Sequence, residues 1–433
     1  MPKDSVAAVL ERLSRLYPKN IDLSLNRMST LLKALGNPQN DLPPVIHIAG
    51  TNGKGSTLAF IRAFLQESGK SVHVYTSPHL VKFNERIVIG GKQISDKQLL
   101  DCLLQVEDAN EGAPLTFFEA TTAAAFLAFS AYPADFVLLE TGMGGRLDAT
   151  NVIKNPVLTL IASLSMDHED FLGHTLAQIA AEKAAIFKNG AVALSQKQLP
   201  EAQKVLETYA NDRAVTLKSE GKDWKIFISK EGFYFNDTLF PHPALKGVHQ
   251  YANAALAIAA VKELNSKWLV NVTDKQIAAG LKSVQWSGRM EKLNDYPIPE
   301  GWELWIDGGH NPGAAEALAA FLPEWEGKPL HIVCGMLTTK DSKKFLKRLA
   351  PFAASLHTVP VPDAIHPGRS PADLAKIAEM SGFHNVKIAD NIPDALTDLT
   401  SGKYSAGRIL VCGSLYLLGN FLSSNKGVKN DRQ

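Results

Sequence analysis

This 433-residue chain has few cysteines, little net charge and only short apolar runs, and each of these features excludes some functions before any motif is considered. Its three cysteines, Cys102, Cys334 and Cys412, are far apart and lack metal-binding spacing, so we expect buried thiols in a reducing compartment rather than disulfides. A formal net charge of +1 gives no basic excess of the kind that draws proteins to nucleic acids or membrane surfaces. Apolar runs such as 123–131 are too short to span a bilayer.

The first residues also lack the apolar stretch of a secretory signal peptide. Asp4 and Glu11 argue against an organellar transit peptide, because such peptides are poor in acidic residues. We therefore expect a cytoplasmic protein with neither a nucleic acid nor a membrane among its partners.

What the chain does have is a glycine-rich segment at 46–57, Ile-His-Ile-Ala-Gly-Thr-Asn-Gly-Lys-Gly-Ser-Thr, between an expected strand and an expected helix. Glycines let backbone N–H groups approach an anion, the helix N-terminus adds its dipole, and Lys54 supplies a point charge. The spacing departs from the standard Gly-x4-Gly-Lys-[Ser/Thr] loop, because Ile48 replaces the first glycine and Gly55 separates Lys54 from the hydroxyl residues. The alternative is a plain glycine-rich turn with an exposed lysine. Strand, turn, lysine, hydroxyls and helix in combination favour a phosphate-binding loop.

Apolar runs such as 45–49 and 136–140 alternate with helical patterns along the chain, which predicts an α/β protein with mainly parallel sheets. The length suggests two or three domains. The segment 293–301 holds two prolines and little apolar periodicity, so we take it as a linker. The prediction is a large phosphate-loop nucleotide domain over 1–292 and a smaller Rossmann-like open α/β domain over 302–433.

Other polar residues follow expected strands, at the edge where open α/β sheets bind ligands. Glu140 ends the run Phe-Val-Leu-Leu-Glu and could either cap the strand or hold a nucleotide-bound Mg²⁺. The residues themselves leave both interpretations open. Asp167 with His168, and the turn at 76–79, are patterns that more often form capped turns than ligand sites.

Three further features are ambiguous when each is taken alone. Lys183 lies in an alanine-rich helical pattern and is interpreted as an ordinary helix lysine. The segment 307–312 again joins a strand to a helix, with a proline near the first turn of that helix. Arg289, after Gly288, could be a solvated arginine at a turn.

In their order and joint presence these segments resemble the folylpolyglutamate synthase family, including its bifunctional dihydrofolate synthase members, which is related to the Mur ligases. The resemblance extends over nearly the whole chain. The matching segments are Gly-Thr-Asn-Gly-Lys-Gly-Ser at 50–56, Ser-Pro-His-Leu at 77–80, Glu-Thr-Gly-Met-Gly-Gly-Arg-Leu-Asp-Ala-Thr-Asn at 140–151, Asp-His at 167–168, Glu-Lys-Ala-Ala-Ile-Phe at 182–187, Asn253, Gly-Arg at 288–289, Asp-Gly-Gly-His-Asn-Pro at 307–312 and Cys-Gly-Ser-Leu-Tyr at 412–416. Ser287 stands where the family usually has proline and Gly309 where it usually has alanine. Both are small turn residues, so we expect the chemistry to be unaffected.

The resemblance implies a role for each matching position. ATP would be bound by Thr51, Asn52, Gly53, Lys54, Gly55, Ser56, Asn253, Arg289, Asp307 and His310. Mg²⁺, at two sites, would be held by Ser77, Glu140, His168 and Lys183, with Lys183 carboxylated so that its cation becomes a carboxylate. The pterin substrate would contact Ile21, Asp22, Leu23, Thr116, Phe118, Leu147, Asp148 and Ala149, and the incoming glutamate would lie near Ser414 and Tyr416. Catalysis would depend on Lys54, His168 and Lys183.

The activity that the resemblance implies is ATP-dependent amide formation by a cytoplasmic monomer. A carboxylate of dihydropteroate or tetrahydrofolate attacks the γ-phosphate to give an acyl phosphate, and the amine of L-glutamate then displaces phosphate. One alternative is a monofunctional folylpolyglutamate synthase. Alternatives of other classes are a phosphate-loop ATPase with a regulatory or mechanical role and a nucleotide-binding module without turnover.

Overall fold

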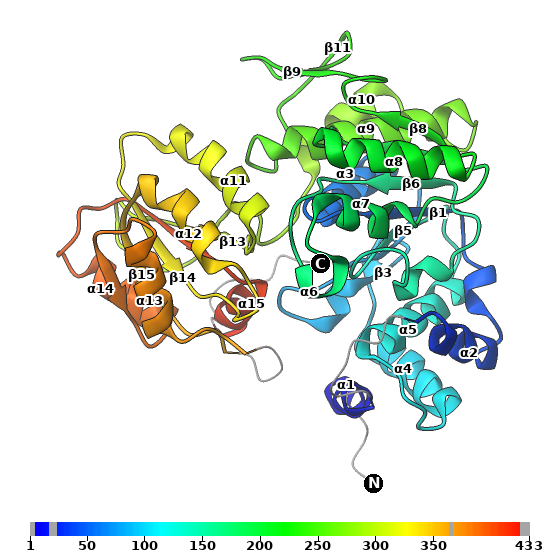
Figure 1. Ribbon diagram of the computed structural model, residues 1–433, viewed down its shortest axis with the longest axis horizontal. Helices are drawn as coiled ribbons and strands as arrows, with labels where there is room; N and C mark the ends of the chain where they lie inside the picture. The colour runs from blue at the N-terminus through cyan, green and yellow to red at the C-terminus, as the bar shows by residue number, and fades with distance from the viewer. Residues whose placement is uncertain (1–4, 17–23, 363–366, 425–433) are drawn as a thin grey trace.

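The computed structural model describes residues 5–16, 24–362 and 367–424. Three of the predicted pterin contacts, Ile21, Asp22 and Leu23, lie outside the described residues. The described chain forms two α/β units, each built on its own sheet, which lie side by side in Figure 1. The predicted fold class is confirmed.

The larger unit contains an eight-stranded sheet with the strand order β4-β3-β2-β5-β1-β6-β7-β8. Neighbouring strands from β2 to β8 in this order pair in parallel. At one edge, β3 pairs antiparallel with β2, and β4 pairs antiparallel with β3. The strands are β1 Val45–Ala49, β2 Val72–Tyr75, β3 Ile87–Ile89, β4 Lys92–Gln93, β5 Phe136–Glu140, β6 Leu158–Ile161, β7 Val192–Ser195 and β8 Thr216–Ser219. The phosphate loop follows β1, in the middle of the sheet, where the carboxyl ends of neighbouring parallel strands meet.

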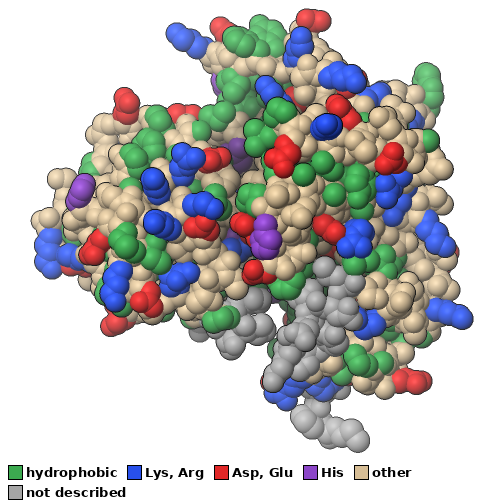
Figure 2. All heavy atoms as spheres, viewed as in Figure 1, with side chains coloured by type: hydrophobic (Ala, Val, Ile, Leu, Met, Phe, Trp, Pro, Cys, Tyr) green, Lys and Arg blue, Asp and Glu red, His purple; other side chains and the backbone are tan. Residues whose placement is uncertain are grey.

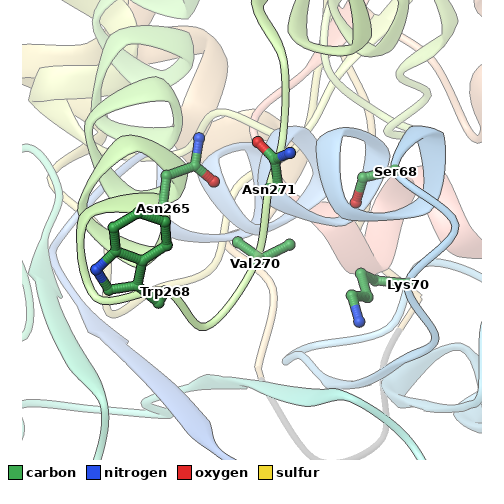
Figure 3. A pocket seen from close by; sticks show the side chains of 6 residues that line it. All are labelled: Ser68, Lys70, Asn265, Trp268, Val270 and Asn271. Carbon is green, nitrogen blue, oxygen red and sulfur yellow. The ribbon is translucent and has the colours of Figure 1, made fainter.

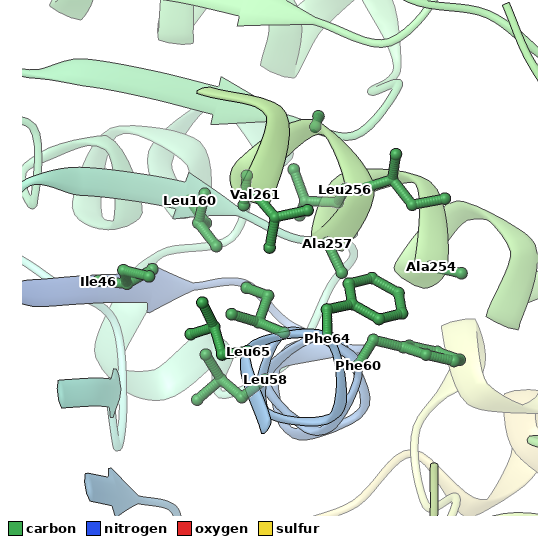
Figure 4. Close-up of a cluster of buried hydrophobic side chains, with 14 of the residues drawn as sticks. Ile46, Leu58, Phe60, Phe64, Leu65, Leu160, Ala254, Leu256, Ala257 and Val261 are labelled. Carbon is green, nitrogen blue, oxygen red and sulfur yellow. The ribbon is translucent and has the colours of Figure 1, made fainter. Parts of the chain in front are cut away.

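Helices cover both faces of this sheet, because its central strands are apolar on both sides. They are α1 Val6–Arg15, α2 Asn26–Ala34, α3 Lys54–Glu67, α4 Asp96–Asn110, α5 Phe117–Ala131, α6 Glu169–Leu172, α7 Leu176–Ala184, α8 Pro200–Asp212, α9 His249–Ser266 and α10 Asp274–Ser283. Figure 4 shows the core on the α3 side, where side chains of α3 meet those of α9 and of the sheet, among them Phe64, Ala257, Ile46 and Leu160. Alternate residues of the same strands, such as Val45 and Leu139, belong to the opposite core with α4 and α5.

A small antiparallel sheet is attached to the larger unit. Its strands are β9 Ile226–Ile228, β10 Phe233–Phe235 and β11 Thr238–Phe240, in the order β11-β10-β9. Phe233, Phe235 and Phe240 of this sheet pack into the same core as α9. The small sheet therefore extends that core rather than forming one of its own.

The smaller unit has a six-stranded sheet with the order β12-β13-β17-β14-β15-β16, parallel except for β12. Its strands are β12 Glu291–Lys292, β13 Glu303–Asp307, β14 Leu330–Cys334, β15 Ala353–Thr358, β16 Val386–Ile388 and β17 Arg408–Cys412. Its helices are α11 Pro312–Phe321, α12 Ser342–Leu349, α13 Pro371–Met380, α14 Ile392–Thr400 and α15 Leu415–Ser424. Short 3₁₀ helices complete the described chain: η1 Pro38–Asn40, η2 Phe83–Arg86, η3 Ala149–Val152, η4 Leu322–Trp325 and η5 Ala350–Phe352.

The boundary between the units remains a prediction, and two observations bear on it. Strand β12 pairs with β13 of the smaller sheet, although 291–292 were assigned to the larger domain. Leu80 of the larger unit belongs to the same buried cluster as Leu417 and Phe421 of α15. The first observation favours a boundary before Glu291, and the second shows that the two units share buried apolar surface.

No helix within the described ranges is long and apolar enough to cross a membrane. Figure 2 shows basic and acidic side chains intermixed over the visible face, without a large patch of one sign. This distribution agrees with the balanced charge of the sequence.

Candidate functional site

The phosphate loop adopts the strand–turn–helix conformation that the glycine pattern predicts. Gly53 is the N-cap of α3 and has φ +85°, a left-handed conformation that glycine tolerates best. A Cβ atom at this position would collide with the side-chain oxygen of Asn253, so space as well as conformation demands glycine. The first-turn N–H groups of α3, which include those of Gly55 and Ser56, have no acceptors within the helix. They are the backbone donors that can bind a phosphate.

Thr51 and Asn52 hold the phosphate loop in place through hydrogen bonds to a neighbouring segment. Their backbone N–H groups both donate to the carbonyl oxygen of Ser163, at 2.8 and 3.2 Å. The Thr51 hydroxyl donates to the carbonyl oxygen of Ser165 at 2.9 Å. These bonds fix the loop to the segment after β6, and they leave the phosphate-binding backbone donors to the residues from Gly53 onward.

Two lysines converge on the carbonyl oxygen of Gly50. The Nζ atoms of Lys54 and Lys183 donate to this oxygen over 3.1 and 3.0 Å, respectively. Burial, followed by the nearby charge of Lys54, lowers the pKa of Lys183 to about 7. Near neutral pH a large share of Lys183 is therefore the free amine. The interpretation of Lys183 as an ordinary helix lysine was wrong, because its side chain is buried beside the phosphate loop.

Glu140 lies at the end of β5 beside this lysine pair. One carboxylate oxygen is 3.8 Å from Nζ of Lys54, and the other accepts the backbone N–H of Ser77 at 3.1 Å. Burial raises the pKa of Glu140, and the charge of Lys54 opposes that rise. A buried carboxylate next to a phosphate loop would gain most from a bound cation.

His168 completes the predicted metal set from the loop after β6. It has φ +52°, and burial lowers its pKa to about 4, so its imidazole is neutral above that pH. Within the described ranges, no three His, Cys, Asp or Glu side chains are close enough to hold a metal by themselves. A carboxylate, a hydroxyl and a carboxylated lysine would supply the oxygen ligands that Mg²⁺ prefers, so the residues fit that ion. The set nevertheless remains a proposal.

A hydrogen-bonded seam joins the phosphate loop to the smaller unit. The side-chain amides of Asn52 and Asn311 bond each other reciprocally, at 3.1 and 3.0 Å. Asn311 is the N-cap of α11 and also donates to Asp167 at 2.9 Å. The phosphate loop, the His168 loop and α11 are therefore held together by one small polar network.

Lys340 is the second contact across this seam. Its Nζ atom lies 2.7 Å from a carboxylate oxygen of Asp167, and both side chains are about nine-tenths buried, with 9% and 11% exposed. Burial alone would raise the pKa of Asp167, but the charges of His168, Lys340 and His310 hold it well below its ordinary value. The ion pair therefore keeps a charged carboxylate next to His168.

We expect Lys340→Met to open the seam, because it leaves the Asp167 carboxylate buried without its ion-pair partner. Loss of one member of a buried pair commonly costs about 3 kcal/mol or more. The radius of gyration by small-angle X-ray scattering should rise in the absence of ligands. Lys328→Met is the matched control, because Lys328 pairs with Glu303 at 3.3 Å and is 43% exposed, where an ion pair contributes little.

The same variant has a defined pH dependence. Because the folded pKa of Asp167 is lowered, its contribution is complete above the unfolded value of about 3.9 and is lost as the pH falls through the folded pKa. The difference in radius of gyration between wild type and Lys340→Met should therefore become smaller below about pH 4. A radius of gyration equal to that of wild type at neutral pH would contradict the role of this pair.

The remaining predicted ATP ligands lie around the same loop and on the facing edge of the smaller sheet. Asn253 touches Gly53, and its amide bonds Gln196 and Gln250 at 2.8 and 2.9 Å. Asp307, at the end of β13, accepts the backbone N–H groups of Met290 and Gly309 at 3.0 and 2.7 Å. These bonds fix Gly309 and Met290, which is the chain neighbour of Arg289, to the end of β13.

His310 and Arg289 belong to this facing edge. Nδ1 of His310 donates to the carbonyl oxygen of Gly308 at 3.0 Å, which leaves Nε2 4.0 Å from Asp167. Burial, and then the charge of Lys340, lowers the pKa of His310 to about 4. The guanidinium of Arg289 lies close to Gly308, where an added Cβ atom would be 2.6 Å from Nη1.

The predicted pterin contacts gather around the loop after β5. The ring of Phe118 lies against Gly142, where a Cβ atom would be 2.5 Å from the ring, and it is 5.9 Å from the ring of Tyr75. Asp148 is buried and accepts from the backbone N–H of Met143 at 2.9 Å. Burial raises its pKa, and its hydrogen bonds oppose the rise. Thr116 forms the N-terminal capping box of α5, so its side chain is engaged within the protein.

The remaining residues predicted to contact the pterin or glutamate differ in how exposed they are. Ala149 and Ser414 are buried, whereas Leu147 and Tyr416 are half-buried. Ser414 follows β17 and lies at the start of α15, at the carboxyl edge of the smaller sheet. Their roles remain proposals.

Sequence reasoning missed the seam residues Asn311 and Lys340 as functional candidates. Asn311 could have been found, because an asparagine before a proline is typical of a helix N-cap. Lys340 gives no local signal, since 173 positions separate it from Asp167.

One cavity lies away from these residues. It measures about 540 Å³ and is lined by Ser68, Lys70, Asn265, Trp268, Val270 and Asn271, as Figure 3 shows. It lies at the carboxyl end of α3, whereas the phosphate loop is at the amino end. None of the candidate residues lines it, so we do not assign the chemistry to it.

Comparison with known families finds two models that together match most of the chain. The model described as Mur ligase middle domain matches residues 48–261. The model described as Mur ligase, glutamate ligase domain matches residues 288–415. The first contains the phosphate loop, and the second contains Asp307, Asn311 and Lys340.

Individual proteins are similar over nearly their full length. A dihydrofolate synthase/folylpolyglutamate synthase of Bacillus subtilis is 35% identical over 414 residues, covering 92% of this chain and 93% of that protein. Escherichia coli FolC in complex with DHPP and ADP has a TM-score of 0.87 at 28% identity, covering 98% of each chain. A bifunctional folylpolyglutamate synthase/dihydrofolate synthase with Mn, AMPPNP and L-glutamate bound has a TM-score of 0.84 at 27% identity, again covering 98% of each chain. The similarity therefore extends over both sheets.

Proposed function

This chain belongs to the folylpolyglutamate synthase family of Mur-type ligases, and from that premise we infer that it is an ATP-dependent ligase. It joins L-glutamate to the carboxylate of dihydropteroate and of tetrahydrofolate, giving dihydrofolate and folylpolyglutamates. The observation that carries this inference is the phosphate loop, which faces a second α/β unit across a seam of buried polar contacts. A ligase that makes a water-sensitive acyl phosphate needs such a closed interface.

Each residue around the loop has a task in this reaction. The N–H groups from Gly53 onward and the Lys54 ammonium offset the negative charge that develops on the transferred phosphoryl group. Glu140, Ser77, His168 and a carboxylated Lys183 would hold Mg²⁺ at two sites, where the ions would neutralise phosphate oxygens. Asp307, Arg289 and His310 would meet the nucleotide from the smaller unit.

Support for the nucleotide and the metal also comes from the relatives. One solved relative contains ADP and another contains AMPPNP with Mn. We propose that this enzyme uses ATP with a divalent metal, that it acts as a monomer, and that its domains meet just before Glu291. Sedimentation of the purified protein would test the monomer.

The decisive assay is ADP release that depends on both a pterin acid and L-glutamate. We expect turnover with dihydropteroate as well as with tetrahydrofolate, because both present a carboxylate to the same γ-phosphate. Turnover with tetrahydrofolate alone would leave a monofunctional folylpolyglutamate synthase. ADP release that ignores both substrates would instead indicate an ATPase of another class.

A further inference from the structure

Arg86 is a buried cation for which the proposed mechanism has no use. It is the last residue of η2, and only 7% of it is exposed. Its carbonyl oxygen accepts the backbone N–H of Thr76 at 3.0 Å, so its backbone is fixed beside the turn that contains Ser77. The position is therefore rigid and next to the candidate metal site.

The described neighbours of Arg86 do not neutralise its charge. Its Nε–H donates to Nδ1 of His79 at 2.9 Å, and burial followed by the charge of Arg86 lowers the pKa of His79 to about 4, so this partner is neutral. Its guanidinium also lies over the rings of Phe83 and Phe117, at 5.1 and 5.8 Å. Within the described ranges, no carboxylate is within ion-pair distance, and no group accepts a hydrogen bond from its two terminal nitrogens.

Two other poorly exposed arginines are paired with carboxylates, whereas Arg62 donates to the carbonyl oxygen of Gly91 at 2.7 Å. Arg27 lies 3.2 Å from Glu119, and Arg408 lies 3.0 Å from Glu303. Removing a guanidinium from water is unfavourable unless a partner charge compensates for it. Arg86 is thus a mostly buried cation without an anionic partner among the described residues.

The surroundings indicate which anion is missing. Besides His79, the groups whose charges act on Arg86 include Tyr75, Tyr416 and Glu140. Tyr416 comes from α15 of the smaller unit, and α15 touches the same turn, because Gly419 lies directly against the carbonyl oxygen of Leu80. Glu140 is already engaged with Ser77 and Lys54. Arg86 therefore lies near Glu140, the ring of Phe117 and α15.

We propose that the guanidinium of Arg86 binds a substrate carboxylate, supplied either by the pterin acid or by the incoming L-glutamate. This assignment rests on the proposed function, in which both substrates are carboxylic acids. The terminal nitrogens of an arginine form a planar fork that matches a carboxylate with two parallel hydrogen bonds. A purely structural role would need only the contacts with His79, Phe83 and Phe117.

The test compares Arg86→Gln and Arg86→Lys with wild type in glutamate-dependent ADP release. Arg86→Gln should raise the KM of one carboxylate substrate at least about 10-fold, as expected when a charge-assisted bond is lost. The KM for ATP and the melting temperature should stay near the wild-type values. Arg86→Lys keeps the charge but loses the fork, so its KM should be intermediate. Arg348→Gln, an exposed arginine of the smaller unit, is the matched control.

The two sources of the carboxylate give different results. A higher KM for L-glutamate alone assigns Arg86 to the amino acid. In that case wild type should prefer L-glutamate to its α-amide, and Arg86→Gln should lose this preference. A higher KM for dihydropteroate, which has a single carboxylate, assigns Arg86 to the acceptor. Unchanged KM values for both substrates, or equal losses for ATP and the acids, would overturn the proposal.

Two further measurements separate this proposal from the proposed function. If wild type shows no glutamate-dependent ADP release, the function is wrong, and calorimetric binding of dihydropteroate or L-glutamate to wild type and Arg86→Gln still tests the arginine. Equal affinities in that experiment would contradict the role of Arg86. If Arg86→Gln does not fold, Arg86→Lys carries the same comparison, and a KM equal to that of wild type for both acids would count against the proposal.

Discussion

Lys54→Ala is expected to lower the turnover number at least about 100-fold while leaving the fold intact, because it removes a cation that faces the transferred phosphoryl group. Lys54 begins α3 and lies between the Gly50 carbonyl oxygen and Glu140. The measurement is glutamate-dependent ADP release, with the melting temperature followed in parallel.

The control for this variant is a lysine just beyond the other end of the same helix. Lys70 follows the other end of α3, where it pairs with Asp135 at 2.9 Å and is partly exposed. Lys70→Ala should keep turnover within about twofold of wild type, since surface pairs contribute little. Near wild-type turnover in Lys54→Ala would remove this lysine from the mechanism.

Lys183→Ala is expected to be nearly inactive and to recover part of its activity when a short carboxylic acid such as acetate is added. The lowered pKa of Lys183, about 7, makes its amine nucleophilic near neutral pH. The ammonium first loses one proton, and addition of the resulting neutral amine to CO₂ then forms an N–C bond and releases a second proton, which leaves a carbamate anion. A small acid in the space left by the side chain would restore the carboxylate.

Two comparisons make this prediction specific. Lys188 also has a lowered pKa, about 8, but its Nζ donates to the side-chain oxygen of Asn151 at 2.7 Å, away from the phosphate loop. Activity lost in Lys188→Ala should therefore not return with acetate. In wild type labelled with ¹³C-bicarbonate, a carbamate resonance should appear and should be missing from Lys183→Ala. An enzyme that is fully active without that resonance would refute the carboxylation.

The phosphate loop could be predicted because its determinants are local. An apolar strand, three glycines and an amphipathic start to the next helix lie within twenty consecutive residues, so chain conformation alone brings Lys54 to the helix N-terminus. The parallel sheets could be predicted for a similar reason, since short apolar runs such as those at β1 and β5 must be covered on both faces. The family resemblance then placed further residues that local patterns left ambiguous.

The burial of Lys183 could not be predicted from the local sequence. Its neighbours in the chain are those of an ordinary surface helix, and nothing in them reveals burial. The structure buries it because the loop after β5 approaches α7 closely: a Cβ atom at Gly145 would lie 2.7 Å from the carbonyl oxygen of Glu182. Burial next to Lys54 lowers its pKa, and both effects arise only from packing between distant segments.

The sequence by itself determined the α/β class, the phosphate loop and the balanced charge, because each depends on composition or on residues a few positions apart. Only the tertiary structure decided which distant side chains meet. Lys340 pairs with Asp167 across the two units, Asn311 pairs with Asn52, and Arg86 is mostly buried without a carboxylate partner in the described part of the chain. No local pattern encodes these contacts, since they form only when the two sheets present their carboxyl edges to each other and exclude water from the polar groups between them.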